Sequence, residues 1–120
     1  MILVDTSVWV DHLRIPEPAL MRLLNESAVF IHPFVVGELA LGNLRRRSVL
    51  DALSLLPQTI VATHDEAMRF IEQHRLFALG IGYVDVHLLA AARLMTDTRL
   101  WTRDKRLHDA ADKLALAVKI

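Results

Sequence analysis

Short apolar runs alternate along the chain with segments whose apolar residues recur at helical spacing. The apolar runs predict short strands at residues 2–4, 28–31, 59–62, 99–102 and 115–118. The periodic segments predict helices at residues 7–13, 19–24, 33–42, 45–56, 65–77, 84–95 and 110–114. Strands that alternate with helices favour a mostly parallel sheet with right-handed crossovers and helices on both faces. We therefore expect an α/β fold around a short sheet of about four to five strands.

Length and composition limit the class of protein further. A chain of 120 residues suits a single domain spanning residues 1–120. Hydrophobic residues make up 53% and charged residues 23%, a composition that excludes a disordered chain. No apolar run approaches the roughly 18 residues of a membrane-spanning helix, and the first residues do not resemble a secretion signal. The absence of cysteine excludes disulfides and thiolate metal sites, and we expect a soluble, cytoplasmic protein.

Acidic residues in apolar surroundings are the main chemical signal. The four residues of this kind are Asp5, Glu38, Asp85 and Asp104. An isolated carboxylate in such a place is costly unless it is paired, hydrogen-bonded or bound to a cation. Asp5 and Asp104 each follow a predicted strand, and they face one crevice if those strands are neighbours. We therefore expect folding to gather all four into a cleft that binds Mg²⁺ or Mn²⁺.

Each of these acidic residues also has a purely structural explanation. The explanations are a helix cap for Asp5, an ion pair with Arg45 or Arg46 for Glu38, a helix cap after Gly82 for Asp85, and a turn with Lys105 for Asp104. Capping and metal binding are compatible with each other. Convergence of all four on one cleft is the property that separates the two interpretations.

The balance of charges gives no general argument for binding nucleic acid. Basic and acidic residues number 14 each, whereas nucleic-acid affinity usually depends on neutralising phosphates. The densest basic cluster is Arg45, Arg46 and Arg47. This triplet is either the solvated face of a helix or a set of contacts with RNA, and the sequence leaves both interpretations open.

Taken in order along the chain, these segments resemble the PIN domain family, and in particular the VapC-type ribonuclease toxins of toxin–antitoxin pairs. The resemblance covers nearly the whole chain. Its carriers are Leu3-Val4-Asp5-Thr6-Ser7, Val36-Gly37-Glu38-Leu39 followed by Gly42, the helix around Asp85, and Leu100-Trp101-Thr102-Arg103-Asp104. No single segment is specific, because an aspartate after an apolar run is common, but the ordered set is a specific signal.

The resemblance implies a three-layer α/β/α PIN domain with Mg²⁺- or Mn²⁺-dependent endoribonuclease activity. It also implies a homodimer that acts as the toxin of a type II pair and is inhibited by a small cognate antitoxin. Transfer RNA is a plausible substrate by resemblance only. Carried over residue by residue, the catalytic metal ligands are Asp5, Glu38, Asp85 and Asp104, and the supporting hydroxyls are Thr6, Ser7 and Thr102. Arg106-Leu107, where many relatives place an aromatic residue, and His87 near Asp85 are departures that bear on fine specificity.

The expected chemistry is in-line displacement at a phosphodiester bond. One or two cations would activate water and offset the charge on the leaving oxygen, so no histidine base is required. Asp5 and Asp85 are the first choices as direct ligands. Glu38 and Asp104 would bind directly, through water, or with a second ion. The family's products carry a 5′-phosphate and a 3′-hydroxyl.

Two other classes of function fit parts of the pattern. A receiver-like phosphoacceptor domain shares the size, the alternating elements and the Mg²⁺-binding carboxylates, but it needs a lysine after a late strand. Lys105 is a poor substitute because it directly follows Asp104. A noncatalytic interaction module is the other alternative.

Histidine and tryptophan residues are expected to be structural. None of the 6 histidines has a partner at the i,i+4 spacing of a helical zinc site, so we expect surface or capping roles. Trp9 and Trp101 stand beside apolar neighbours, and both are expected in the core.

Overall fold

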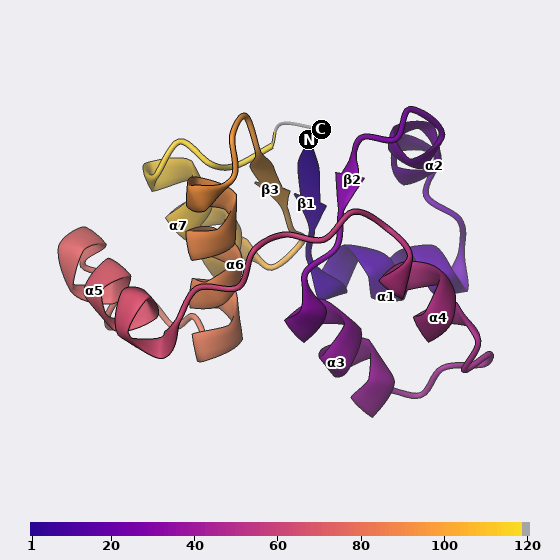
Figure 1. Cartoon of the computed structure of the whole chain (residues 1–120), viewed down its shortest axis with the longest axis horizontal. Coiled ribbons are helices and arrows are strands. Elements are labelled where there is room, and N and C mark those ends of the chain that lie inside the picture. The colour runs from indigo at the N-terminus through magenta and orange to yellow at the C-terminus, as the bar shows by residue number, and fades with distance from the viewer. Residues whose placement is uncertain (119–120) are drawn as a thin grey trace.

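The computed structural model describes residues 1–118 and has a parallel, three-stranded sheet at its centre (Figure 1). The strands are β1 (Ile2–Val4), β2 (Val29–Phe30) and β3 (Arg99–Trp101), in the order β2-β1-β3. Leu3 pairs with Phe30 on one side and with Leu100 on the other, so the first strand of the chain is the central one.

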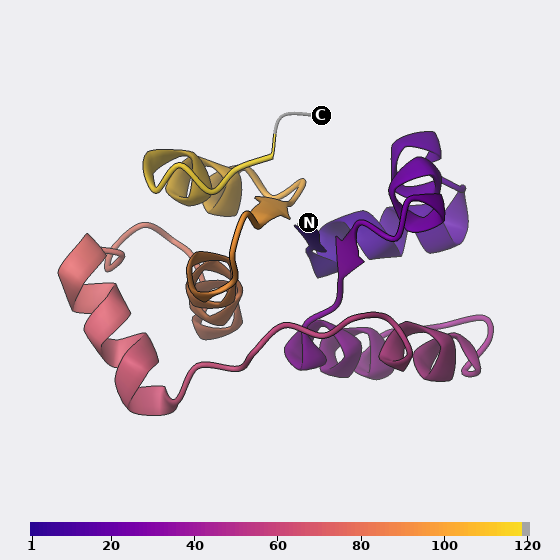
Figure 2. The same cartoon turned by 45° about the horizontal axis from the view of Figure 1, so that its top comes forward.

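Helices flank this small sheet on both sides. They are α1 (Thr6–Arg14), α2 (Pro18–Asn25), α3 (Pro33–Leu41), α4 (Val49–Ser54), α5 (His64–His74), α6 (Tyr83–Leu94) and α7 (Lys105–Lys113). Figures 1 and 2 show α1 to α4 grouped on one side of the strands and α5 to α7 on the other. The expected α/β/α fold is therefore confirmed. No helix of residues 1–118 is long and apolar enough to cross a membrane.

The local sequence explains why the elements form where they do. Leu3 and Val4 are fully buried, as expected for an inner strand of a parallel sheet. Proline at the first position starts both α2 and α3, where its missing N–H has no helical partner to lose. α6 is buried along residues 86–92, and its run of alanines lets neighbouring elements approach closely. Trp9 and Trp101 are buried in the core as expected.

The sheet is narrower than the expected four to five strands. Residues 59–62 and 115–118 each contribute only an isolated bridge nearby, Ile31 with Gln58 and Leu100 with Ala117. After Thr59 the chain leaves the sheet and leads to α5, and the β-branched Ile60 and Val61 remain exposed. β-propensity alone does not make a strand where no partner runs alongside.

Helix boundaries also differ from expectation at three places. The helix expected from residue 45 begins at Val49, because residues 43–48 form the loop that turns the chain back onto α3. The helix expected to reach residue 77 ends at His74, where Arg75 takes a left-handed conformation with φ of 53°. α7 starts five residues earlier than the expected residue 110, at Lys105, because the side chain of Asp104 caps it.

Candidate active site

The carboxyl ends of β1 and β3 bring distant parts of the sequence together. Val4 pairs with Trp101, and the Asp5 N–H donates to the Trp101 carbonyl oxygen at 2.9 Å. The residues after both strands therefore emerge at the same edge of the sheet, where open α/β sheets bind their ligands. The expectation that the strands before Asp5 and Asp104 are neighbours is confirmed.

Asp5 is held rigidly at this edge by hydroxyl groups. Its side chain is 5% exposed, and Oδ2 accepts hydrogen bonds from Ser7 Oγ and Thr102 Oγ1, both at 2.7 Å. The Arg103 N–H donates to Ser7 Oγ at 3.0 Å, which fixes the hydroxyl in turn. Within residues 1–118, Oδ1 of Asp5 takes part in no hydrogen bond. The site thus presents one oriented carboxylate oxygen and uses the other as an anchor.

Glu38 reaches the same region from α3. Thr6 Oγ1 donates to Glu38 Oε1 at 2.7 Å, which ties this exposed carboxylate to the first turn of α1. An ion pair with Arg45 or Arg46 was the structural alternative, and Glu38 forms no ion pair within the described part of the chain. The hydroxyl therefore orients Glu38 without neutralising its charge.

Asp85 shows that the carboxylates converge. Its Oδ2 accepts a hydrogen bond from the Gly82 N–H at 2.9 Å, which caps the start of α6. Burial raises the pKa of Asp85, and the charges of Asp5, Asp104 and Glu38 raise it further, although the Gly82 hydrogen bond opposes the shift. The other three acidic residues thus lie near enough to Asp85 to affect its pKa, although each of the four comes from a different element or strand end.

Asp104 completes a set of carboxylates at helix starts. It caps α7 by accepting from the Leu107 N–H at 3.0 Å through Oδ1, and its own N–H donates to Thr102 Oγ1 at 3.1 Å. Asp5 likewise caps α1. The capping explanation is therefore correct for Asp5 and Asp85, whereas Asp104, for which a turn with Lys105 was the structural explanation, caps α7 instead. Each cap engages one carboxylate oxygen, and helix N-termini favour negative charge nearby.

These acidic side chains lie near one another at one edge of the sheet without enclosing an ion by themselves. Among the described residues, no three histidine, aspartate or glutamate side chains are grouped closely enough to hold a metal ion alone. The donor set nevertheless suits Mg²⁺ or Mn²⁺, because it offers only hard oxygen ligands. Mg²⁺ commonly keeps several waters and is held by one or two carboxylates together with substrate phosphates. Carboxylates that are too far apart to hold an ion alone are therefore consistent with an ion that binds together with a substrate phosphate.

The arginine triplet lies in the loop between α3 and α4 and not on a helix face. Arg47 Nη1 donates to the Ala40 carbonyl oxygen at 2.9 Å, so this residue fastens the loop to the end of α3. Arg45 and Arg46 line a pocket that Glu38 also borders. The structure thus separates the triplet into one structural arginine and two beside the acidic cleft.

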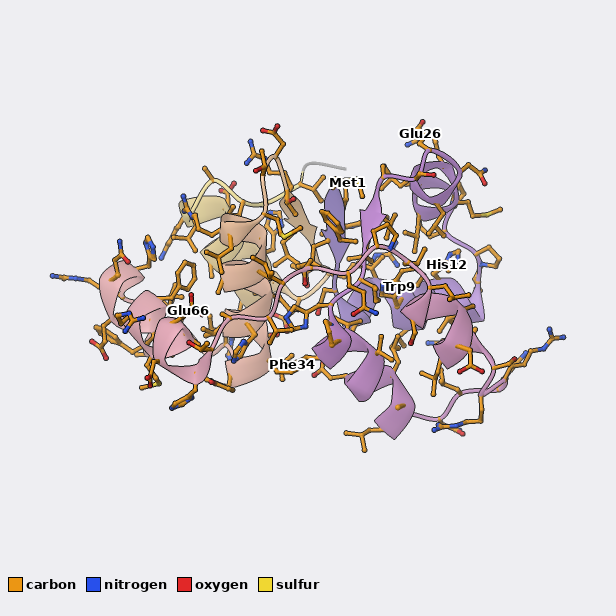
Figure 3. The ribbon with its side chains drawn as sticks, in the orientation of Figure 1. Met1, Trp9, His12, Glu26, Phe34 and Glu66 are labelled. Atoms are coloured by element: carbon orange, nitrogen blue, oxygen red, sulfur yellow. The ribbon has the colours of Figure 1, made fainter. Side chains whose placement is uncertain are left out.

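An aromatic and histidine cluster between α3 and α6 was not anticipated. His32 and His87 are both buried, with ring centroids 6.4 Å apart. Phe34, which is labelled in Figure 3, packs edge-on against each of them at a centroid distance of 4.9 Å. Tyr83 covers His87 from the other side at 4.6 Å. Capping is correct for His32, whose Nδ1 accepts from the Phe34 N–H at 2.9 Å, but a surface role is wrong for His87. The apolar residues on both sides of His87 were the available signal.

Comparison with known proteins assigns the family. The family model of the PIN domain matches residues 2–113. The chain therefore belongs to the PIN domain family. Ribonuclease VapC32 of Mycobacterium tuberculosis, in strains CDC 1551 / Oshkosh and ATCC 25618 / H37Rv, is 47% identical over 119 residues, which are 98% of this chain and 96% of that protein. Within the family, the chain is of the VapC type.

Solved structures agree with this fold. The crystal structure of PAE2754 from Pyrobaculum aerophilum superimposes with a TM-score of 0.64 at 17% identity, over 98% of this chain and 87% of that one. The crystal structure of FitAcB from Neisseria gonorrhoeae gives a TM-score of 0.64 at 22% identity, over 100% of this chain and 97% of that one. At these identities the likeness establishes the fold.

Proposed function

We propose that the chain cuts RNA at its acidic cleft with the help of a divalent cation held by Asp5, Glu38, Asp85 and Asp104. A VapC-type PIN protein is a toxin endoribonuclease, and the 47% identity to Ribonuclease VapC32 extends over nearly the whole chain. The observation that supports the location best is the pairing of β1 with β3, which brings Asp5 and Asp104 to one edge of the sheet. The pKa of Asp85 is raised by burial first, and the charges of Asp5, Asp104 and Glu38 raise it further. Oxygen ligands of this kind favour Mg²⁺ or Mn²⁺.

The residues of the cleft have distinct roles in this proposal. Asp5 and Asp85 hold the cation directly, and Glu38 and Asp104 hold it directly, through water, or with a second ion. Thr6, Ser7 and Thr102 each hold a carboxylate oxygen in place, which leaves the partner oxygen free to bind. When bound, the cation lowers the pKa of a water molecule and offsets charge at the phosphate. A histidine base is then unnecessary.

The proposal extends to partners and to organisation. The substrate is RNA, with transfer RNA as the first class to test, and the expected place of action is the cytoplasm, where RNA is available. A small cognate antitoxin would inhibit the toxin by covering the cleft, as the second protein of a type II pair. We also propose that residues 1–120 form one PIN domain that works as a homodimer. The support for these points is membership of the PIN family and of its VapC type.

Removal of the metal tests the mechanism directly. The chain, purified free of any partner, is incubated with mixed RNA in Mg²⁺, in Mn²⁺ and in EDTA. We expect cleavage in both metals, none in EDTA, and recovery when Mg²⁺ is added in excess. The Asp5→Asn variant keeps the side-chain shape but loses a ligand charge, so it should be nearly inactive while retaining its circular dichroism spectrum. Cleavage that is indifferent to EDTA would contradict the proposed mechanism.

A further inference from the structure

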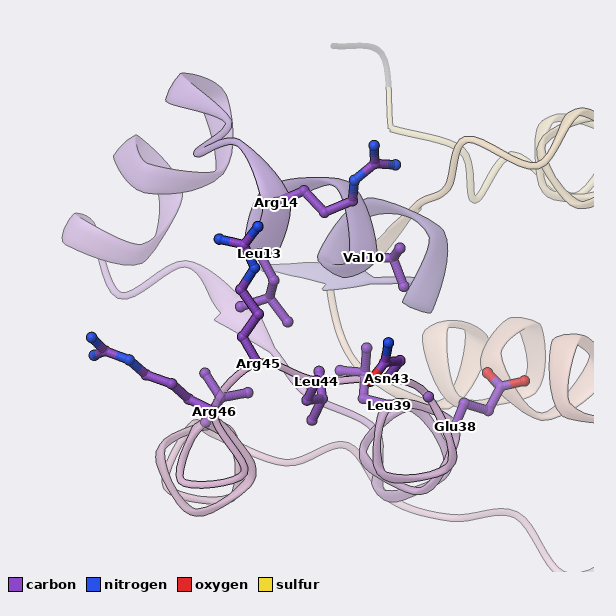
Figure 4. Close-up of a pocket in the computed structure, with 11 residues that line it drawn as sticks. Val10, Leu13, Arg14, Glu38, Leu39, Asn43, Leu44, Arg45 and Arg46 are labelled. Carbon is purple, nitrogen blue, oxygen red and sulfur yellow. The ribbon is translucent and has the colours of Figure 1, made fainter.

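A pocket of about 420 Å³ opens beside the acidic cleft, between α1, α3 and the loop that leads to α4 (Figure 4). Its lining consists of Val10, Leu13, Arg14, Glu38, Leu39, Gly42, Asn43, Leu44, Arg45, Arg46 and Val49. Glu38 connects the pocket to the acidic residues, because it lines the pocket and its carboxylate accepts a hydrogen bond from Thr6, the residue after Asp5. Whatever enters the pocket therefore lies next to Glu38.

The pocket floor suits a flat, apolar group. Five of its eleven lining residues are aliphatic, and Val10 in particular remains 44% exposed on α1 although it lines the pocket. The volume lies within the range of pockets that bind small organic groups. Asn43 is the neutral polar side chain of the lining, and its amide offers both donors and an acceptor. An aliphatic floor with one amide group can hold a heterocyclic base and contact its edge.

Three arginines and Glu38 are the charged residues of the pocket lining. Arg14, Arg45 and Arg46 are exposed, and none of them forms an ion pair within residues 1–118. In Figure 4, Arg45 extends from the loop toward Leu13 on α1, while the guanidinium groups of Arg14 and Arg46 point away from the aliphatic floor. Guanidinium groups without a partner favour a polyanionic ligand, and Arg matches phosphate geometry well.

We propose that this pocket receives one unstacked base of a single-stranded RNA, beside the phosphate that is cut. Arg14, Arg45 and Arg46 contact phosphates on either side of that base, and Asn43 contacts its edge. This inference rests on the proposed function and adds a source of sequence preference to it. Single-stranded RNA is read in this way, by splayed bases held against side chains and by phosphate contacts.

The test uses variants that change the pocket and spare the carboxylates. Val10→Phe fills the pocket from an exposed position, Asn43→Ala removes the amide, and Arg45→Gln and Arg46→Gln each remove one guanidinium. Arg22→Gln is the control, because Arg22 is exposed on α2 outside the pocket. Each is made in the Asp5→Asn background, and binding of fluorescein-labelled 12-mers of rA, rC, rG and rU is measured. Thermal unfolding shows that each variant is folded.

The expected results differ between the variants. Val10→Phe should weaken binding of the preferred 12-mer roughly tenfold, which is about the effect of losing the contacts of one stacked base. Asn43→Ala should reduce the difference between the preferred and the other 12-mers. Each arginine variant should weaken the binding of all four 12-mers. It should also reduce the magnitude of the slope of log affinity against log salt concentration by about 0.7. Arg22→Gln should match the parent in all of these measurements.

Cleavage mapping separates this inference from the proposed function. The same substitutions in the active chain should shift the sequence context of the cut sites in total RNA. If the parent chain cuts no RNA in Mg²⁺ or Mn²⁺, the proposed function fails. If the parent cuts RNA but Val10→Phe and Asn43→Ala behave like Arg22→Gln, the base pocket is wrong. If Val10→Phe weakens only the binding of an inhibitory protein partner and leaves the cut sites unchanged, the pocket is a peptide groove and the inference is overturned.

Discussion

At the scale of single residues, the carboxylates of the cleft divide their oxygens between structure and chemistry. Asp5, Asp85 and Asp104 each use one oxygen to cap a helix, so the fold depends on their shape as well as on their charge. The negative charges remain close together. Burial raises the pKa of Asp85, and the charges of the neighbouring carboxylates raise it further. A carboxyl whose folded-state pKa is raised is ionised at a cost to stability at neutral pH.

Asp85→Asn should therefore stabilise the metal-free chain. The amide oxygen can still accept the hydrogen bond from Gly82, while the charge that repels Asp5, Asp104 and Glu38 disappears. We expect a higher melting temperature in EDTA at pH 7.5 and a smaller gain from added Mg²⁺ than in the parent. Thermal unfolding with and without Mg²⁺ measures both effects. Asp51→Asn, at an exposed position on α4, is the control, and an equal rise there would contradict the explanation.

At the scale of elements, one arginine joins the end of β3 to the first two helices. Arg103 Nη1 lies 2.7 Å from Asp11 Oδ2 on α1, and Nη2 lies 2.9 Å from Glu17 Oε2 at the start of α2. The backbone N–H of Arg103 also donates to Ser7 Oγ. The residue thus fastens the segment that carries Thr102 and Asp104.

Arg103→Gln should lower the free energy of unfolding by roughly 1 kcal/mol, since both ion pairs are partly exposed. The loss should shrink in high salt, which screens such pairs. Urea unfolding at low and high NaCl measures it. Lys105→Gln breaks the more exposed pair with Asp109 and should cost only about 0.3 kcal/mol. An equal decrease in the free energy of unfolding in the two variants would show that the ion pairs of Arg103 stabilise the fold no more than the pair of Lys105 with Asp109 does.

Most helices and strands were predicted from the sequence. The errors arose where tertiary contacts determine whether a segment forms a strand or a helix. β1 and β3 were recognisable because they are short apolar runs followed by an aspartate. Residues 59–62 have the same β-branched composition but lack a neighbouring strand, which composition cannot reveal. The acidic residues were found because a charge in apolar sequence needs an explanation. The pocket between α1 and α3 could not be predicted, because it depends on how the loop at residues 43–48 folds back.

At the scale of the whole molecule, a buried histidine pair couples two helices of the cleft and responds to pH. Burial and the nearby His87 lower the pKa of His32 from 6.5 to about 4. Burial, and then His64, lower the pKa of His87. The unfolded chain therefore takes up protons between about pH 6.5 and pH 4 that the folded chain does not.

Stability should fall as the pH falls through that range, by up to about 1.4 kcal/mol per pH unit for His32. Above pH 6.5 this contribution is constant, because His32 is neutral in both states. Urea unfolding at intervals from pH 7.5 to 5 measures the slope. His32→Asn can still cap α3, so it should be less stable at pH 7.5 but show a shallower dependence on pH. An unchanged slope would exclude His32 as its source.

The central position of β1 has a consequence for synthesis of the protein. β1 is translated before its partner β3, and the hydroxyl of Thr102 that holds Asp5 lies 97 residues after it in the sequence. A nascent polypeptide lacks both partners until residue 102 has been translated. A product whose translation stops before residue 99 therefore lacks β3, Thr102 and Asp104, and we expect it to be inactive as a nuclease.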